Sequence, residues 1–234
     1  MKGKVRSARC PLRCGVAVAL GLAAWGMTAL EIEAQDPIEA AVIHPPMAAR
    51  FQCSEHPLGD VEHVGDALGA DCVVFRREGG PNGDLNVQYR GDGTRNEDWF
   101  SWREPLLAPF DGVVTVIQEN EETTVPGTPG PGRSAAILFR EGFEDDPDAL
   151  QVAYVHVREV TVAVGDTVRA GEPVARIGNN GTSFNPHLHI GAFRGDLYSD
   201  DAVPLQIRFD LEAMGRLRGL VGELGVGAPL DPPR

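Results

Sequence analysis

Lysine is nearly absent from this sequence, since Lys2 and Lys4 are its only lysines. If the first residues are removed, no lysine is left to act as a nucleophile, form a Schiff base or carry an attached cofactor. The sequence also has no Gly-x-Ser-x-Gly elbow, no Walker-type phosphate loop and no His-Glu-x-x-His helix. These absences exclude elbow-type serine hydrolases, P-loop proteins and the helical class of zinc peptidases.

Positive charge is scarce as well. The chain has 21 basic against 34 acidic residues, which gives a net charge of −13. Residues 1–34 hold five basic and two acidic side chains, so the remaining 200 residues carry a net charge of −16. We therefore expect no nucleic-acid partner. Roughly 200 residues are enough to bury one good hydrophobic core.

The N-terminus has the pattern of a secretory signal peptide. Basic residues precede an apolar run from Gly15 to Leu30 that is broken only by Thr28, and Ile32-Glu33-Ala34 follows. The run is short for a membrane span, so we expect cleavage after Ala34 and no other membrane association. The mature protein is then exported, to the periplasm or the cell exterior. The alternative is that the run stays uncleaved and makes a single N-terminal tether.

Cysteine is the next scarce residue. Cys10 and Cys14 belong to the expected signal peptide, which leaves Cys53 and Cys72 in an oxidising compartment. We predict that these two form a disulfide. In the chain-entropy model a loop of this size adds about 3 kcal/mol to stability. A two-cysteine metal site is the alternative, but the chain has no closely spaced second pair.

The rest of the chain divides into three parts. Residues 35–84 are expected to form an N-terminal extension that contains the disulfide, 85–209 a β-rich domain, and 210–234 a short helix and tail. Short apolar stretches between glycine and proline turns predict a mainly β fold, an antiparallel sheet or half-barrel. Asp210 can cap the helix. The predicted strands are 72–75, 85–89, 105–108, 112–118, 135–139, 151–157, 160–162, 173–177, 187–193 and 205–209, and the predicted exposed loops are 120–133 and 141–148.

Two histidines stand out within the last of the dense β signals. His187 and His189 occupy positions i and i+2 of an apolar run, so they project from the same face of a strand. Paired imidazoles suit metal ligation or proton transfer. The glycine-rich turn 178–181 lies just upstream, and strand ends beside such turns often carry sites. We predict a functional site here.

Five segments follow one another along the chain: Leu107–Val114, Tyr154–His156, the hairpin Val164–Ala175, Gly178–Gly181 and Pro186–His189. Together they closely resemble the LytM/lysostaphin-like zinc metallopeptidases, whose fold is called the duplicated hybrid motif. The resemblance extends from about Asp98 to Phe193. The hairpin is also similar to carriers of biotin and lipoate, but these require a lysine at the hairpin tip, and this hairpin contains none.

The resemblance implies a site and a substrate. In that family a His-x-x-x-Asp motif supplies two zinc ligands, and the second histidine of His-x-His supplies the third. By position, Asp98 and His189 would be ligands here, while His156 and His187 would polarise water and stabilise the oxyanion. The implied reaction is cleavage of peptidoglycan peptides by metal-activated water.

The sequence departs from this family at Thr94, where the first zinc histidine is expected. A threonine hydroxyl is a poor zinc ligand, and three substitutes are open: the amide oxygen of Asn96, the carboxylate of Asp92, or His156 in a changed role. Asn96 and Asp98 could also belong to an ordinary polar turn.

Three histidines lie N-terminal to the resemblance, and we expect them to be surface residues rather than ligands; they are His44, His56 and His63. Two functions follow. The first is an exported zinc metalloendopeptidase acting on peptidoglycan, which the retained histidines favour. The second is a catalytically degenerate relative that binds cell wall or regulates another hydrolase, which the missing histidine favours.

Overall fold

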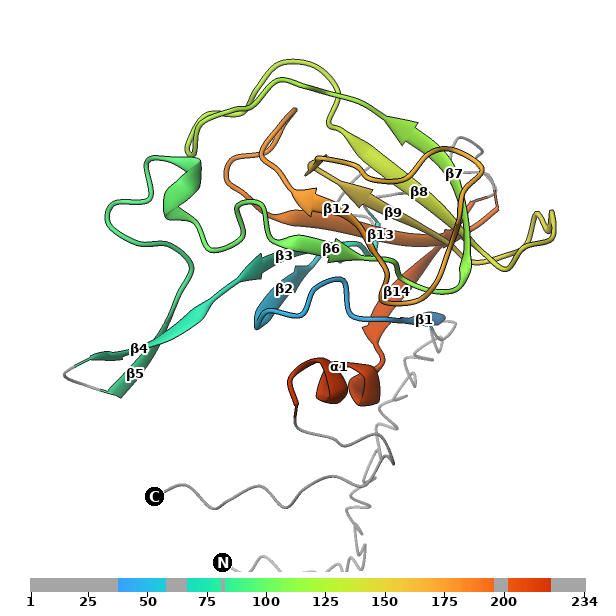
Figure 1. Cartoon of the computed structure of the whole chain (residues 1–234), viewed down its shortest axis with the longest axis horizontal. Helices are drawn as coiled ribbons and strands as arrows, with labels where there is room; N and C mark the ends of the chain where they lie inside the picture. Colours follow the sequence, from blue (N-terminus) through green and yellow to red (C-terminus); the bar gives the residue numbers. More distant parts are fainter. Residues whose placement is uncertain (1–37, 58–66, 81–82, 196–201, 220–234) are drawn as a thin grey trace, which may run out of the picture. The chain divides into compact units, whose positions relative to one another are not determined.

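In the part of the chain that the structure describes, nearly all regular secondary structure is strand, and one short helix follows the last strand (Figure 1). The prediction of a mainly β fold is confirmed, since the main sheet curls into a half-barrel. The expected signal peptide and His63 lie outside the described residues. The computed structural model describes residues 38–57, 67–80, 83–195 and 202–219.

The main sheet is antiparallel, as predicted, except that its first strand pairs in parallel with the last. In spatial order its continuous path is β1 (Ala40–Ile43), β14 (Val203–Phe209), β13 (Leu188–Arg194), β9 (Gln151–Val155), β8 (Ala136–Glu141), β7 (Gly112–Gln118) and β11 (Thr167–Val168).

Two further strands, β2 (Phe51–Glu55) and β3 (Ala70–Val74), attach to this sheet through β13. One edge of β13 is shared, because residues 188–190 pair with β3 and residues 192–194 pair with β14. The segment that we treated as an N-terminal extension therefore contributes three strands to the main sheet.

The predicted disulfide is present between Cys53 and Cys72, which lie directly opposite each other on β2 and β3. Cys72 is fully buried within the main hydrophobic core.

A smaller sheet packs against the main one. It consists of β10 (Val157–Arg158), β12 (Pro173–Ile177) and β6 (Pro105–Leu107). The buried Tyr154 of β9 links the two sheets, because its hydroxyl donates to the Leu107 carbonyl over 3.0 Å. A separate hairpin is formed by β4 (Arg76–Gly80) and β5 (Gly83–Val87), and a 3₁₀ turn covers Asn96–Asp98.

Burial on both faces explains the apolar character of β13. Leu188, Ile190 and Ala192 enter the main core, while Phe193 packs on the other face with Ala153 and Leu138. The alternation leaves His189 on the face opposite Leu188 and Ile190. A buried central strand thus carries a histidine at its beginning.

Most predicted elements are confirmed, and the exceptions have local causes. The predicted strand 151–157 breaks at His156, whose φ of +62° is incompatible with a strand. Residues 160–162 form no strand. The helix α1 (Leu211–Leu217) is capped as predicted, because the Asp210 carboxylate accepts hydrogen bonds from the backbone N–H groups of Glu212 and Ala213.

The two predicted loops, 120–133 and 141–148, are largely exposed and contain no strand apart from Glu141, the last residue of β8. The first loop runs beside residues 179–184, to which it makes three backbone hydrogen bonds. Within the described part of the chain, no helix has the length and apolar character needed to cross a membrane.

The contact between the two sheets gives a first prediction. Tyr154→Phe deletes only the hydroxyl and leaves the Leu107 carbonyl without its donor, so the free energy of unfolding falls by about 1–3 kcal/mol. Urea denaturation measures the change. Thr115→Val is the control, because the half-buried Thr115 hydroxyl makes a longer bond of 3.3 Å and costs less. Equal stability of Tyr154→Phe and the unmodified protein would contradict the assigned link.

Candidate metal centre and active site

A pocket of about 420 Å³ opens where β13 begins. It combines ionisable side chains from both halves of the chain, none of which is fully exposed. They are His56, Asp71, His156, His187 and His189.

Strand register places Asp71 and His189 together. The two residues lie directly opposite each other on β3 and β13, and Val155 of β9 lies on the other side of His189. Side chains of opposed residues on one face of a sheet are in contact range. His189 Nδ1 accordingly lies 2.9 Å from an Asp71 carboxylate oxygen.

His56 reaches the same place from the neighbouring strand. Ser54 of β2 is opposite Asp71, and His56 follows two residues later, on the same face. A backbone hydrogen bond from His56 to Gly69 extends the pairing past the end of β2. His56 Nε2 lies 3.5 Å from the second carboxylate oxygen of Asp71.

These three side chains suit a metal ion. One ligand atom from each of His56, Asp71 and His189 lies within 4.8 Å of the others, and no further group of this kind occurs among the described residues. Ligands of a tetrahedral zinc ion, with bonds of about 2.0–2.1 Å, are separated by roughly 3.3 Å. The distances of 2.9 Å from His189 and 3.5 Å from His56, each to a different oxygen of the Asp71 carboxylate, are close to this value. Two imidazoles and a carboxylate also form a donor set that leaves the fourth position open.

The electrostatics favour a ligating carboxylate. Burial alone would raise the pKa of Asp71, but hydrogen bonds and attraction from His187 and His189 outweigh it and hold this pKa well below its usual range. Asp71 is therefore ionised at working pH, as ligation requires. Its side chain remains 41% exposed, so the pocket is accessible to an ion and to water.

Backbone carbonyls orient the other two imidazoles. His187 Nδ1 lies 2.8 Å from the Asn185 carbonyl, and His156 Nδ1 lies 2.9 Å from the Asn180 carbonyl. A carbonyl only accepts, so both Nδ1 atoms carry hydrogen and both Nε2 atoms are left for proton exchange. The two rings lie 4.6 Å apart between centroids.

His156 is held in an uncommon backbone conformation. Its carbonyl accepts a hydrogen bond from Gly178 N, and a Cβ at Gly178 would approach that carbonyl oxygen to 2.6 Å. Glycine is therefore required opposite His156. Burial, followed by repulsion from His187, lowers the pKa of His156 to about 3, so its imidazole is neutral at working pH.

The structure brings together His156, His187 and His189, as expected from the sequence, but neither Asp98 nor Asn96 lines their pocket. Asp98 accepts hydrogen bonds from the backbone and guanidinium of Arg95. The buried Asn96 donates to the Thr124 carbonyl and accepts from Asn179.

The two other residues considered as substitutes for the missing zinc histidine, Asp92 and His156, are not part of the group of potential ligands either. Thr94 and Asp92 hydrogen-bond to each other in an exposed turn. His156 does line the pocket, but it is not part of the group of three potential ligands.

Sequence reasoning missed His56 and Asp71. We expected His56 to be a surface residue rather than a ligand, but the structure places its half-buried ring in the lining of the pocket. A signal was available: a disulfide between Cys53 and Cys72 brings the residues that flank them side by side. His56 and Asp71 are 15 positions apart, too far for a short motif.

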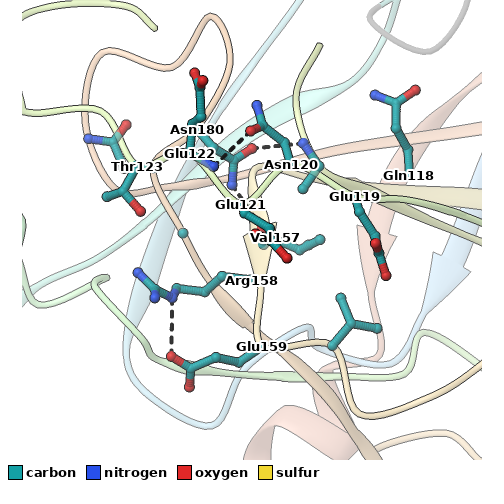
Figure 2. Close-up of a pocket in the computed structure, with 14 residues that line it drawn as sticks. Gln118, Glu119, Asn120, Glu121, Glu122, Thr123, Val157, Arg158, Glu159 and Asn180 are labelled. Carbon is teal, nitrogen blue, oxygen red and sulfur yellow. Dashed lines mark hydrogen bonds and ion pairs between the residues drawn. The ribbon is translucent and has the colours of Figure 1, made fainter. Parts of the chain in front are cut away.

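A second pocket, of about 320 Å³, has different chemistry (Figure 2). Figure 2 shows Arg158 paired with Glu159 on one side and the segment Gln118–Thr123 on the others, with Glu119, Glu121 and Glu122 among its side chains. No histidine lines it. Asn180 borders this pocket with its side chain and holds His156 with its carbonyl, so it connects the two pockets.

Comparison with known proteins agrees with the resemblance seen in the sequence. Residues 100–200 match the model of Peptidase family M23. An uncharacterized metalloprotease of Haemophilus influenzae is 36% identical over 85 residues, which is 36% of this chain and 15% of that protein. The chain thus matches only a small part of that relative's length. His56 and Asp71 lie N-terminal to the region that the family model covers.

Three solved structures are similar at low identity. A variant catalytic domain of the prophage-encoded M23 protein EnpA from Enterococcus faecalis is 18% identical with a TM-score of 0.40, covering 67% of this chain and 90% of that one. A zinc-containing peptidase from Vibrio cholerae is 16% identical with a TM-score of 0.42, covering 71% of this chain and 40% of that one. The lysostaphin catalytic domain from Staphylococcus simulans is 20% identical with a TM-score of 0.37, covering 67% of this chain and 86% of that one.

The match of residues 100–200 to the model of Peptidase family M23 confirms the resemblance to LytM/lysostaphin-type metallopeptidases.

Proposed function

We propose that this chain is an exported zinc metalloendopeptidase that cleaves peptides of cell-wall peptidoglycan. The observation that carries the proposal is the convergence, in one pocket, of three potential ligands and two oriented imidazoles. The proposed ligands are His56, Asp71 and His189. This set replaces Asp98 and Asn96, which the sequence had suggested beside His189.

The proposed mechanism assigns a separate role to each remaining imidazole. Zinc bound by the three ligands would lower the pKa of a water molecule and polarise the scissile carbonyl. Neutral His156 accepts a proton through Nε2, and its Nδ1–H bond to Asn180 keeps that atom turned away from the backbone. His187, whose Nε2 lies 3.4 Å from Asp71, stabilises the charge that develops on the reacting oxygen in the form that also carries a hydrogen on Nε2.

Export is part of the proposal. A disulfide persists in oxidising compartments, so the Cys53–Cys72 bond supports a location outside the cytoplasm. The N-terminal pattern of basic and apolar residues supports the same location. Peptidoglycan, which lies outside the cytoplasm, would then be accessible to the enzyme.

The alternative was a catalytically degenerate domain that binds cell wall or regulates another hydrolase. It depended on the missing histidine at Thr94. His56 offers an imidazole from another strand, so the observation behind this alternative no longer favours it.

The ligand assignment gives a prediction that separates the two possible sets. His56→Ala, Asp71→Ala and His189→Ala each remove a donor and weaken zinc binding by at least about 100-fold. Equilibrium dialysis with metal analysis measures the affinity. Asp98→Asn is the matched control and leaves it unchanged. Zinc lost in Asp98→Asn but retained in Asp71→Ala would reinstate the ligand set suggested by the sequence.

The catalytic assignment predicts loss of hydrolysis without loss of metal. His156→Asn and His187→Gln reduce peptidoglycan hydrolysis by roughly 100- to 10,000-fold and retain zinc, because the first removes the proton acceptor and the second the group that stabilises the developing charge. Asparagine is chosen for position 156 because it tolerates a positive φ. Release of soluble fragments from peptidoglycan measures the activity. His44→Gln, outside the pocket, remains active, and full activity of both other variants would refute the assigned roles.

A further inference from the structure

The disulfide lies in the hairpin that carries two of the three proposed ligands. Cys72 directly follows Asp71, and Cys53 precedes His56 by three residues. The cysteines form one opposed pair of β2 and β3, and Ser54 with Asp71 forms the next. The disulfide is therefore one residue pair away from Asp71, one of the proposed ligands.

Apart from the disulfide and the pairing with β3, β2 is held by Phe51, which packs against the main core, and by Glu55, whose carboxylate accepts hydrogen bonds from Gln206. Among the described residues β2 pairs only with β3, and its five residues are exposed or half-buried. Its aromatic contact, between Phe51 and Phe209, lies at the end of the strand away from His56. A short edge strand with so little buried surface opens more readily than the centre of a sheet.

Metal ligation requires a single register of this hairpin. A slip of one residue would turn His56 to the opposite face, and a slip of two would move it by about 7 Å along the strand. Either displacement exceeds the 3.5 Å that separates His56 Nε2 from the Asp71 carboxylate. A cross-link between directly opposed residues prevents both slips.

The sulfur atoms act from outside the pocket. Side chains alternate along β3, so Cys72 enters the hydrophobic core while Asp71 faces the pocket. The cysteines therefore act on the site only through the backbone of the two strands. Neither cysteine lines the pocket.

We propose that the Cys53–Cys72 disulfide is a positioning element of the metal centre, which holds His56 and Asp71 at ligand spacing and so sets the affinity for zinc. This inference rests on the proposed function, in which these two residues are ligands.

The test compares zinc affinity in Cys53→Ala/Cys72→Ala with that of the oxidised protein. Alanine is used instead of chemical reduction because free thiolates bind zinc themselves. Competition with a chromophoric chelator, below the thermal midpoint of each protein, is expected to give an affinity 10- to 100-fold weaker in the variant. Asp210→Ala is the control, because it destabilises the helix cap and leaves the hairpin and the affinity unchanged.

A relocated disulfide tests position independently of folding. Glu55 and Ala70 form the next opposed pair on the same face as the cysteines, beside a cavity of about 260 Å³ that can hold the sulfur atoms. Adding Glu55→Cys/Ala70→Cys to the double-alanine variant restores the cross-link, and we expect zinc affinity to return with it. This comparison remains valid if the double-alanine variant fails to fold.

Two results would overturn the proposal. A folded double-alanine variant with unchanged zinc affinity would mean that the bond only stabilises the fold. A relocated disulfide that restores thermal stability without zinc affinity would mean the same. If the oxidised unmodified protein binds no zinc, the metal centre itself, and with it the proposed function, is refuted.

Discussion

The register of β13 between β3 and β9 is the constraint on which the site depends. It places Asp71 opposite His189 on one side and Val155 on the other. The same register sends Leu188 and Ile190 into the core. A slip by one residue would bury His189 and expose both apolar side chains, so hydrophobic packing and site geometry are enforced by the same pairing.

Charge in the pocket is organised around one carboxylate. Asp71 lies within 3.5 Å of an atom of each of His56, His187 and His189. The imidazoles of His156 and His187 are fixed by carbonyls of the turn that precedes β13. The segment Gly178–His187 is therefore both the connection into the central strand and the element that sets the direction of two histidines.

The sequence was informative where function is encoded locally. His156, His187 and His189 each belong to a short motif next to a strand, and the structure brings all three to one pocket. His56 and Asp71 could not be assigned in this way, because their role depends on pairing between distant strands. Asp98 was chosen by its position before a matching strand, but its surroundings are a polar turn capped by Arg95.

The secondary structure was also predictable only where the signal is local. Apolar runs and turn residues predicted β7 and β12 with their observed bounds. β2 was missed because an exposed edge strand of five residues lacks a continuous apolar pattern. The predicted strand at 151–157 was interrupted because His156 has a left-handed conformation, and propensity gives no sign of this. Asn96, considered as a ligand, instead joins the loop 120–133 to the turn at Asn179.

The separation of Asp71 and His189 by 118 residues has a consequence for the order of events during folding. Contacts between such distant positions require closure of a long loop, so they form slowly compared with local hairpins. A chain in which β3 has not yet joined β13 cannot hold the three donor groups together. The pocket is therefore completed only by the pairing that joins the N-terminal hairpin to the central strand, and a fragment restricted to residues 100–200 would lack His56 and Asp71.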